Sequence, residues 1–137
     1  MHDLYHNIAV QQALNPVTAT SNQTSAAIDL RGFNSATVVF AVGQSGDTLS
    51  GSLCWTLKLQ DSDDNSSYSD VTTAGLVNSA ASYVIDDAAK DETAYSFGYI
   101  GGKRYLKAVA TKTGTHTNGT PIGVLALKGH ASLKPVT

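Results

Sequence analysis

The chain has 137 residues, the size of one ordinary domain, and a formal net charge of only −2. So weak a charge gives no reason to expect a nucleic-acid partner, because nucleic-acid binding relies on an excess of Lys and Arg. No stretch approaches the ~20 apolar residues that span a bilayer, so we expect no membrane partner. The first ten residues lack a cationic start followed by an apolar run, which predicts no secretory signal and synthesis in a cytoplasm.

The composition favours β structure with many turns. Charged residues make up 15% of the chain, against roughly 25% in ordinary globular domains. There are 14 serines, 15 threonines and 12 glycines but only one glutamate, Glu92, although glutamate is a frequent helix former. The single cysteine, Cys54, excludes an internal disulfide and a cysteine-based zinc site.

The N-terminal residues 1–17 show no clear period and end near Pro16, which pushes the preceding residue to an extended conformation. A short helix and an extended arm both fit this segment. We therefore predict an N-terminal arm over residues 1–17 and a single β domain over residues 18–137. The competing interpretation is that the arm pairs as an extra edge strand of its own domain.

From residue 18 onward, short apolar runs alternate with turn signals at a spacing of about ten residues. The predicted fold is all-β, an antiparallel β-sandwich or jelly roll of about eight to ten short strands with an N-terminal arm. The strand candidates are residues 18–21, 26–30, 36–42, 53–60, 68–71, 82–85, 94–100, 103–112 and 121–129.

Two strands have informative patterns. Residues 36–42 are apolar on both faces, which predicts a central strand lying between two layers. Residues 53–60 alternate strictly, and we expect Trp55 on the buried face. The pairs Gly101-Gly102 and Asn118-Gly119 predict tight hairpin turns between neighbouring strands.

The sequence contains no complete catalytic or metal-binding motif, so we predict no enzyme activity, no catalytic residue, no cofactor and no metal. The acidic loop around Asp61 and Asp64 resembles the start of a calcium loop, but Ser66 and Thr72 stand where glycine and a bidentate Glu are needed. His116 is expected to be exposed or packed on a loop. An aromatic set could form a sugar-binding platform, although such sets more often pack in a core or interface: Tyr95, Phe97, Tyr99 and Tyr105.

Two stretches have hairpin-like motifs. The first is WTLKLQDSDD at 55–64 followed by YSDV at 68–71, and the second is YIGGKRYLKAV at 99–109 followed by GTHT at 114–117 and GH at 129–130. Together they resemble small structural proteins of tailed bacteriophages that are usually encoded close to the major capsid protein. The resemblance covers residues 50 to 135 approximately.

The resemblance implies a virion component, and we expect a decoration or cement protein that binds the outside of the major capsid protein lattice and stabilises the head. It implies copies of the same chain as neighbours, a homo-oligomer on the virion, location on the capsid surface, and synthesis in the bacterial host cytoplasm. A tail or head-fibre β module that binds host-surface carbohydrate is the alternative, and an enzyme with a cryptic site is a third. The predicted capsid or subunit interface lies on the arm: Leu4, Tyr5, His6, Ile8, Val10 and Leu14.

Overall fold

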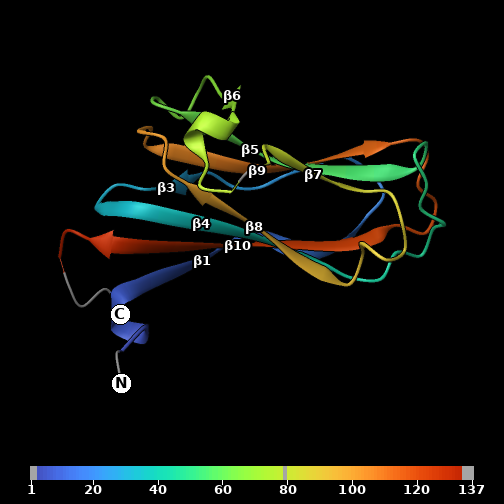
Figure 1. Cartoon of the computed structure of the whole chain (residues 1–137), viewed down its shortest axis with the longest axis horizontal. Coiled ribbons are helices and arrows are strands. Elements are labelled where there is room, and N and C mark those ends of the chain that lie inside the picture. The colour runs from blue at the N-terminus through green and yellow to red at the C-terminus, as the bar shows by residue number, and fades with distance from the viewer. Residues whose placement is uncertain (1–2, 79, 134–137) are drawn as a thin grey trace.

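The computed structural model describes residues 3–78 and 80–133, and ten strands form two stacked antiparallel sheets (Figure 1). Sheet A has four strands, in the order β1 (Ile8–Ala19), β10 (Thr120–Ala131), β4 (Phe33–Val42) and β8 (Thr93–Tyr99). Short 3-10 turns lie at η1 (Tyr5–Asn7) and η2 (Thr73–Gly75). Neither of these helical turns is long enough to cross a membrane, and the described residues contain no helix that is.

Sheet B has six strands, and β5 and β9 form its centre. Two short strands pair with β9 along one side and two with β5 along the other. Its members are β2 (Gln23–Thr24), β3 (Ile28–Asp29), β9 (Tyr105–Thr113), β5 (Cys54–Ser62), β6 (Ser69–Asp70) and β7 (Ser82–Ile85). The predicted all-β antiparallel sandwich is therefore confirmed.

The chain passes repeatedly from one sheet to the other. Strand β8 belongs to sheet A, β9 to sheet B and β10 to sheet A again. The hairpins predicted at Gly101-Gly102 and Asn118-Gly119 are therefore wrong, because both segments connect the two sheets. Gly119 still needs its glycine, since its φ is +86° and a Cβ would meet the carbonyl oxygen of Ala19 at 2.8 Å.

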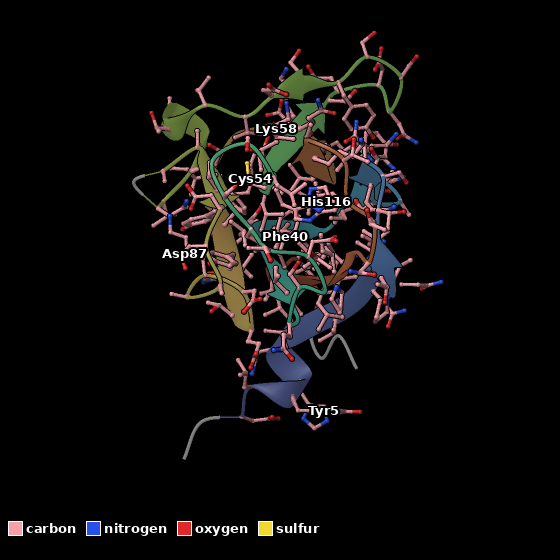
Figure 2. All side chains as sticks on the ribbon, turned by 90° about the vertical axis from the view of Figure 1, so that its right-hand side faces the viewer. Tyr5, Phe40, Cys54, Lys58, Asp87 and His116 are labelled. Atoms are coloured by element: carbon pink, nitrogen blue, oxygen red, sulfur yellow. The ribbon has the colours of Figure 1, made fainter. Side chains whose placement is uncertain are left out.

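The core lies between the two sheets, where Figure 2 shows Phe40. Phe40, Trp55 and Phe97 have no exposed surface, and the rings of Phe40 and Phe97 meet edge to face at 5.7 Å. The alternation predicted for residues 53–60 is confirmed, because Trp55, Leu57 and Leu59 are all fully buried.

The N-terminal segment differs from its prediction. Residues 8–19 form β1, which pairs antiparallel with β10 from Ile8 opposite Gly129 to Ala19 opposite Thr120. The boundary expected after residue 17 falls within β1, and of the separate strand expected at 18–21 only the first two residues are in a strand, as the end of β1. The competing interpretation, that this segment pairs as an edge strand of its own domain, agrees with the structure for residues 8–19. Sequence periodicity missed this strand because its register shifts between Gln12 and Leu14, and again before Val17.

Candidate interaction surface

The outward side of sheet A carries no charged side chain and is mostly apolar, with a few polar residues such as Gln12, Thr37 and Ser96. In β4 the alternate residues Val38, Phe40 and Val42 point into the core, so Val39 and Ala41 point away from it. Register extends this outward side across the sheet. We call it the apolar sheet face, and it comprises Ile8, Val10, Gln12, Thr37, Val39, Ala41, Ala94, Ser96, Gly98, Gly123, Leu125, Leu127 and Gly129.

Several of these side chains are open to solvent. Val10 is 58% exposed and Leu125 is 41% exposed. The prediction that β4 lies between two layers is therefore wrong: β4 is central within its sheet, but no described segment packs as a second layer over Val39 and Ala41. The apolar residues on both sides of β4 and β10 were visible in the sequence, and they mark this uncovered face.

The outward side of sheet B is different in chemistry. Lys58 on β5 pairs with Asp70 on β6 at 3.0 Å, and the amide of Gln60 donates to the same carboxylate at 2.9 Å. Lys107 on β9 lies over the ring of Tyr68. This alternation of buried apolar and outward polar residues is the usual pattern of a sheet that faces water. The contrast identifies the apolar sheet face as the candidate interaction surface.

The N-terminal turn η1 adjoins one end of the apolar sheet face. Leu4 and Tyr5 are 66% and 69% exposed, and Figure 2 shows Tyr5 projecting well away from the core. A hollow of about 200 Å³ lies against the turn, and its lining combines the apolar Leu4, Ile8 and Leu127 with the polar Ser35 and the charged Lys128. The turn therefore extends the apolar surface beyond the strands.

The structure places the six predicted interface residues in three environments. Leu4, Tyr5 and His6 lie exposed in and next to η1, while Ile8 and Val10 lie on the apolar sheet face. His6 contacts the carboxylate of Asp3 through its Nδ1. Leu14 is different, because it packs against the core. The interface role of these residues stays a prediction. Sequence reasoning missed the larger part of the surface, on β4 and β10.

The aromatic set does not form a platform. Phe97 is fully buried and Tyr99 is 4% exposed, whereas Tyr105 lies in the other sheet. The Tyr99 hydroxyl donates to Asp61 at 2.9 Å, and burial raises the pKa of this phenol to about 12. The idea of a sugar-stacking surface built from these rings is therefore wrong, and Phe97 and Tyr99 contribute to the core.

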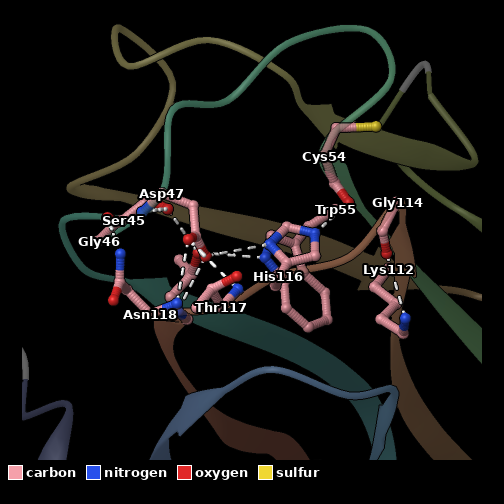
Figure 3. A network of polar contacts seen from close by, with 12 residues as sticks. Ser45, Gly46, Asp47, Cys54, Trp55, Lys112, Gly114, His116, Thr117 and Asn118 are labelled. Atoms are coloured by element: carbon pink, nitrogen blue, oxygen red, sulfur yellow. Dashed lines mark hydrogen bonds and ion pairs between the residues drawn. The ribbon is translucent and has the colours of Figure 1, made fainter.

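At the opposite end of the sandwich a buried polar network joins the loops (Figure 3). The ring of His116 lies 4.8 Å from that of Trp55, its Nε2 donates to the Cys54 carbonyl at 3.2 Å, and its Nδ1 lies 3.6 Å from Asp47. Of the two environments expected for His116, the packed one is confirmed. The Asp47 carboxylate also accepts the backbone N–H groups of Asn118 and Gly119, which lowers the pKa of Asp47. These hydrogen bonds join the loop that contains Asp47 to the loop at residues 116–119, which connects the two sheets.

The acidic loop closes on itself. Asp64 accepts backbone N–H groups of Ser67 and Ser66 and the Ser62 hydroxyl, and these bonds lower its pKa to about 2. Among residues 3–78 and 80–133, no three His, Cys, Asp or Glu side chains are grouped so as to hold a metal ion.

These carboxylates predict acid sensitivity. Arg104 pairs with Asp29 and lowers the pKa of Asp29 to about 2. The hydrogen bonds within the acidic loop lower the pKa of Asp64 to about 2 as well. Because both folded-state pKa values lie below the ordinary 3.8, the unfolded chain binds more protons at low pH. The free energy of unfolding should be constant above about pH 5 and fall as the pH drops from about 4 to 2. Urea unfolding across this range measures it. Asp64→Asn should flatten the fall, and Asp63→Asn, which removes none of these bonds, should not.

No family model matches the chain, and no curated protein matches its sequence. A search of solved structures finds the crystal structure of SPBc2 prophage-derived protein YomS, with a TM-score of 0.53 and 14% sequence identity. The match covers 89% of this chain and 92% of that chain. This protein is thus an all-β sandwich whose fold is similar to that of a prophage-derived protein.

Proposed function

We propose that this chain is a non-enzymatic structural protein of a bacteriophage virion that decorates the outside of the capsid. In this proposal it is made in the host cytoplasm and binds the major capsid protein and neighbouring copies of itself. The apolar sheet face is the observation that carries the proposal, because an uncharged face of this size gains free energy when a partner covers it. The fold shared with a prophage-derived protein and the resemblance of residues 50 to 135 support the phage context.

The size of the apolar sheet face suits attachment to a repeating lattice. Four strands about 4.8 Å apart and about six residues long present roughly 400 Å². One partner in a standard interface buries about 800 Å², so this face alone would give a weak contact. The hollow beside η1 enlarges it, and several simultaneous contacts on a lattice add through multivalency. The partner surface is expected to be apolar and uncharged at its centre, since it must not leave a buried charge unpaired.

Leu125→Lys tests the proposal directly. Leu125 lies near the centre of the apolar sheet face, so a lysine there would place a charge against the partner. We expect capsid binding to weaken by about 2 kcal/mol or more, roughly thirtyfold. The measurement is co-sedimentation of the purified chain with heads of the phage that encodes it, prepared without this protein.

Val84→Lys is the matched control. Val84 lies on the outward side of sheet B and is 42% exposed, against 41% for Leu125. The control should bind heads like the unchanged chain. Equal binding by all three proteins would exclude the apolar sheet face as the docking surface. Sedimentation with tails or fibres but not with heads would replace the decoration role with the tail or head-fibre alternative.

A further inference from the structure

A second hollow lies at the end of the sandwich where β4 begins and β8 ends. Figure 1 shows where these two strand ends lie in the fold. Its volume is about 320 Å³, which is within the range of small-ligand and side-chain pockets. The segment 30–36 forms one side and the segment 99–104 forms the other. Residues 30–32 and 100–104 are links between the two sheets, whereas residues 33–36 are the start of β4 and Tyr99 is the end of β8.

The cations around this hollow are not equivalent. The guanidinium of Arg104 binds both oxygens of Asp29 at 2.9 Å, and the Lys103 amine lies 3.6 Å from Asp61. Arg31 also lines the hollow, but within residues 3–78 and 80–133 no carboxylate lies at ion-pair distance from its guanidinium. Asp29 cannot serve both arginines in the same way, since Arg104 already engages both of its oxygens. Among the residues that the structure describes, no acidic side chain lines the hollow.

Much of the rest of the hollow's lining is apolar side chain, or backbone with free space beside it. Ile100 is 62% exposed at the hollow, and Phe33 lies nearby with the amine of Lys128 over its ring. A Cβ at Gly102 would meet no atom within 4 Å, so the space beside this backbone is empty. The ring of Tyr99 is not open, because Gly101 packs so closely that a Cβ there would lie 2.7 Å from it.

We propose that this hollow binds a carboxylate side chain of a partner polypeptide, next to an apolar residue of the same segment. The Arg31 guanidinium pairs with the carboxylate in a bidentate manner, which its planar fork favours. The side-chain amide of Asn34, which lines the same hollow, is a second donor, and the apolar residue packs against Ile100. The hollow lies at the ends of β4 and β8, whereas the apolar sheet face is the outward side of the same strands, so the two can bind different groups.

A peptide pair tests the site. The probe is the blocked tripeptide acetyl-Leu-Glu-Leu-amide, and its matched control carries Gln in place of Glu. In a titration of the isotope-labelled full chain followed by NMR, we expect shifts confined to the amides of residues 30–36 and 99–104. The Glu peptide should bind about tenfold more tightly than the Gln peptide, since only Glu forms the ion pair.

Variants fix the site of binding. Arg31→Gln should lower affinity for the Glu peptide to that of the Gln peptide, and Gly102→Leu should block both peptides by filling the hollow. Lys90→Gln removes a cation elsewhere and should change nothing. Unchanged spectra away from the site show that each variant is folded. Absence of shifts at millimolar peptide, equal binding of both peptides, or binding that survives Arg31→Gln would overturn the proposal. Tighter binding of glucuronate than of the Glu peptide would overturn the choice of a polypeptide ligand.

Discussion

Deleting residues 1–14 is expected to unfold the isolated chain or to leave it only marginally stable. The deletion removes β1 from Ile8 to Leu14 and leaves β10 from Val124 to Gly129 without its neighbour. It also removes Ala13, which is 5% exposed, and Leu14, which packs against the core. Each lost backbone hydrogen bond costs about 0.5–1.5 kcal/mol, and a fully buried leucine would cost about 1.5–3 kcal/mol, of which the partly buried Leu14 contributes a share. Several such losses approach the whole stability of a domain, about 5–15 kcal/mol.

Deleting residues 1–7 is the matched control. It removes η1 with the exposed Leu4 and Tyr5 but keeps β1, so the chain should stay folded. Circular dichroism and thermal unfolding distinguish the two truncations. If the chain without residues 1–14 melts like the intact protein, β1 is a dispensable arm and its pairing with β10 contributes little.

Trp55→Ala is expected to cost about 3–5 kcal/mol, and so to lower the melting temperature by roughly 10–20 °C. The indole is fully buried, its Nε1 donates to the hydroxyl of Thr120 at 3.1 Å, and its ring packs on His116. Alanine would leave a cavity between the sheets and would uncouple β5 from β10 at this end.

Trp55→Phe separates the two contributions of the indole. Phenylalanine retains much of the apolar volume but cannot donate to Thr120. The Thr120 hydroxyl keeps its bond to Ser45, so it is not left unpartnered. The expected loss is about 1–2 kcal/mol. A Trp55→Ala variant that melts within a few degrees of the unchanged protein would contradict the central place given to this side chain.

The strands that sequence could predict are those whose own alternation is regular. The period of residues 53–60 identifies β5, and residues 82–85 coincide with β7. Strand β1 was missed for a physical reason. Its two register shifts and Pro16 interrupt the alternation, and its partner β10 lies at the far end of the chain. Local pattern cannot reveal a pairing between the first and last strands.

The turn residues also predicted only part of the topology. Gly101-Gly102 and Asn118-Gly119 do mark changes of chain direction, but glycine dipeptides do not tell whether the next strand joins the same sheet. The burial of His116 depends on Asp47, a residue about seventy positions earlier. For the candidate site, the apolar residues on both sides of β4 and β10 were visible. Whether a second layer covers such a face is decided by the packing of distant elements.

Quantitative mass spectrometry of purified virions tests the central proposal most directly. The phage that encodes this chain is purified, and its copy number is measured against that of the major capsid protein. The decoration role predicts a copy number comparable with that of the capsid protein, and its loss from heads when Leu125→Lys replaces the unchanged chain. Absence from the virion, or presence in only a few copies that remain with the tail, would contradict it.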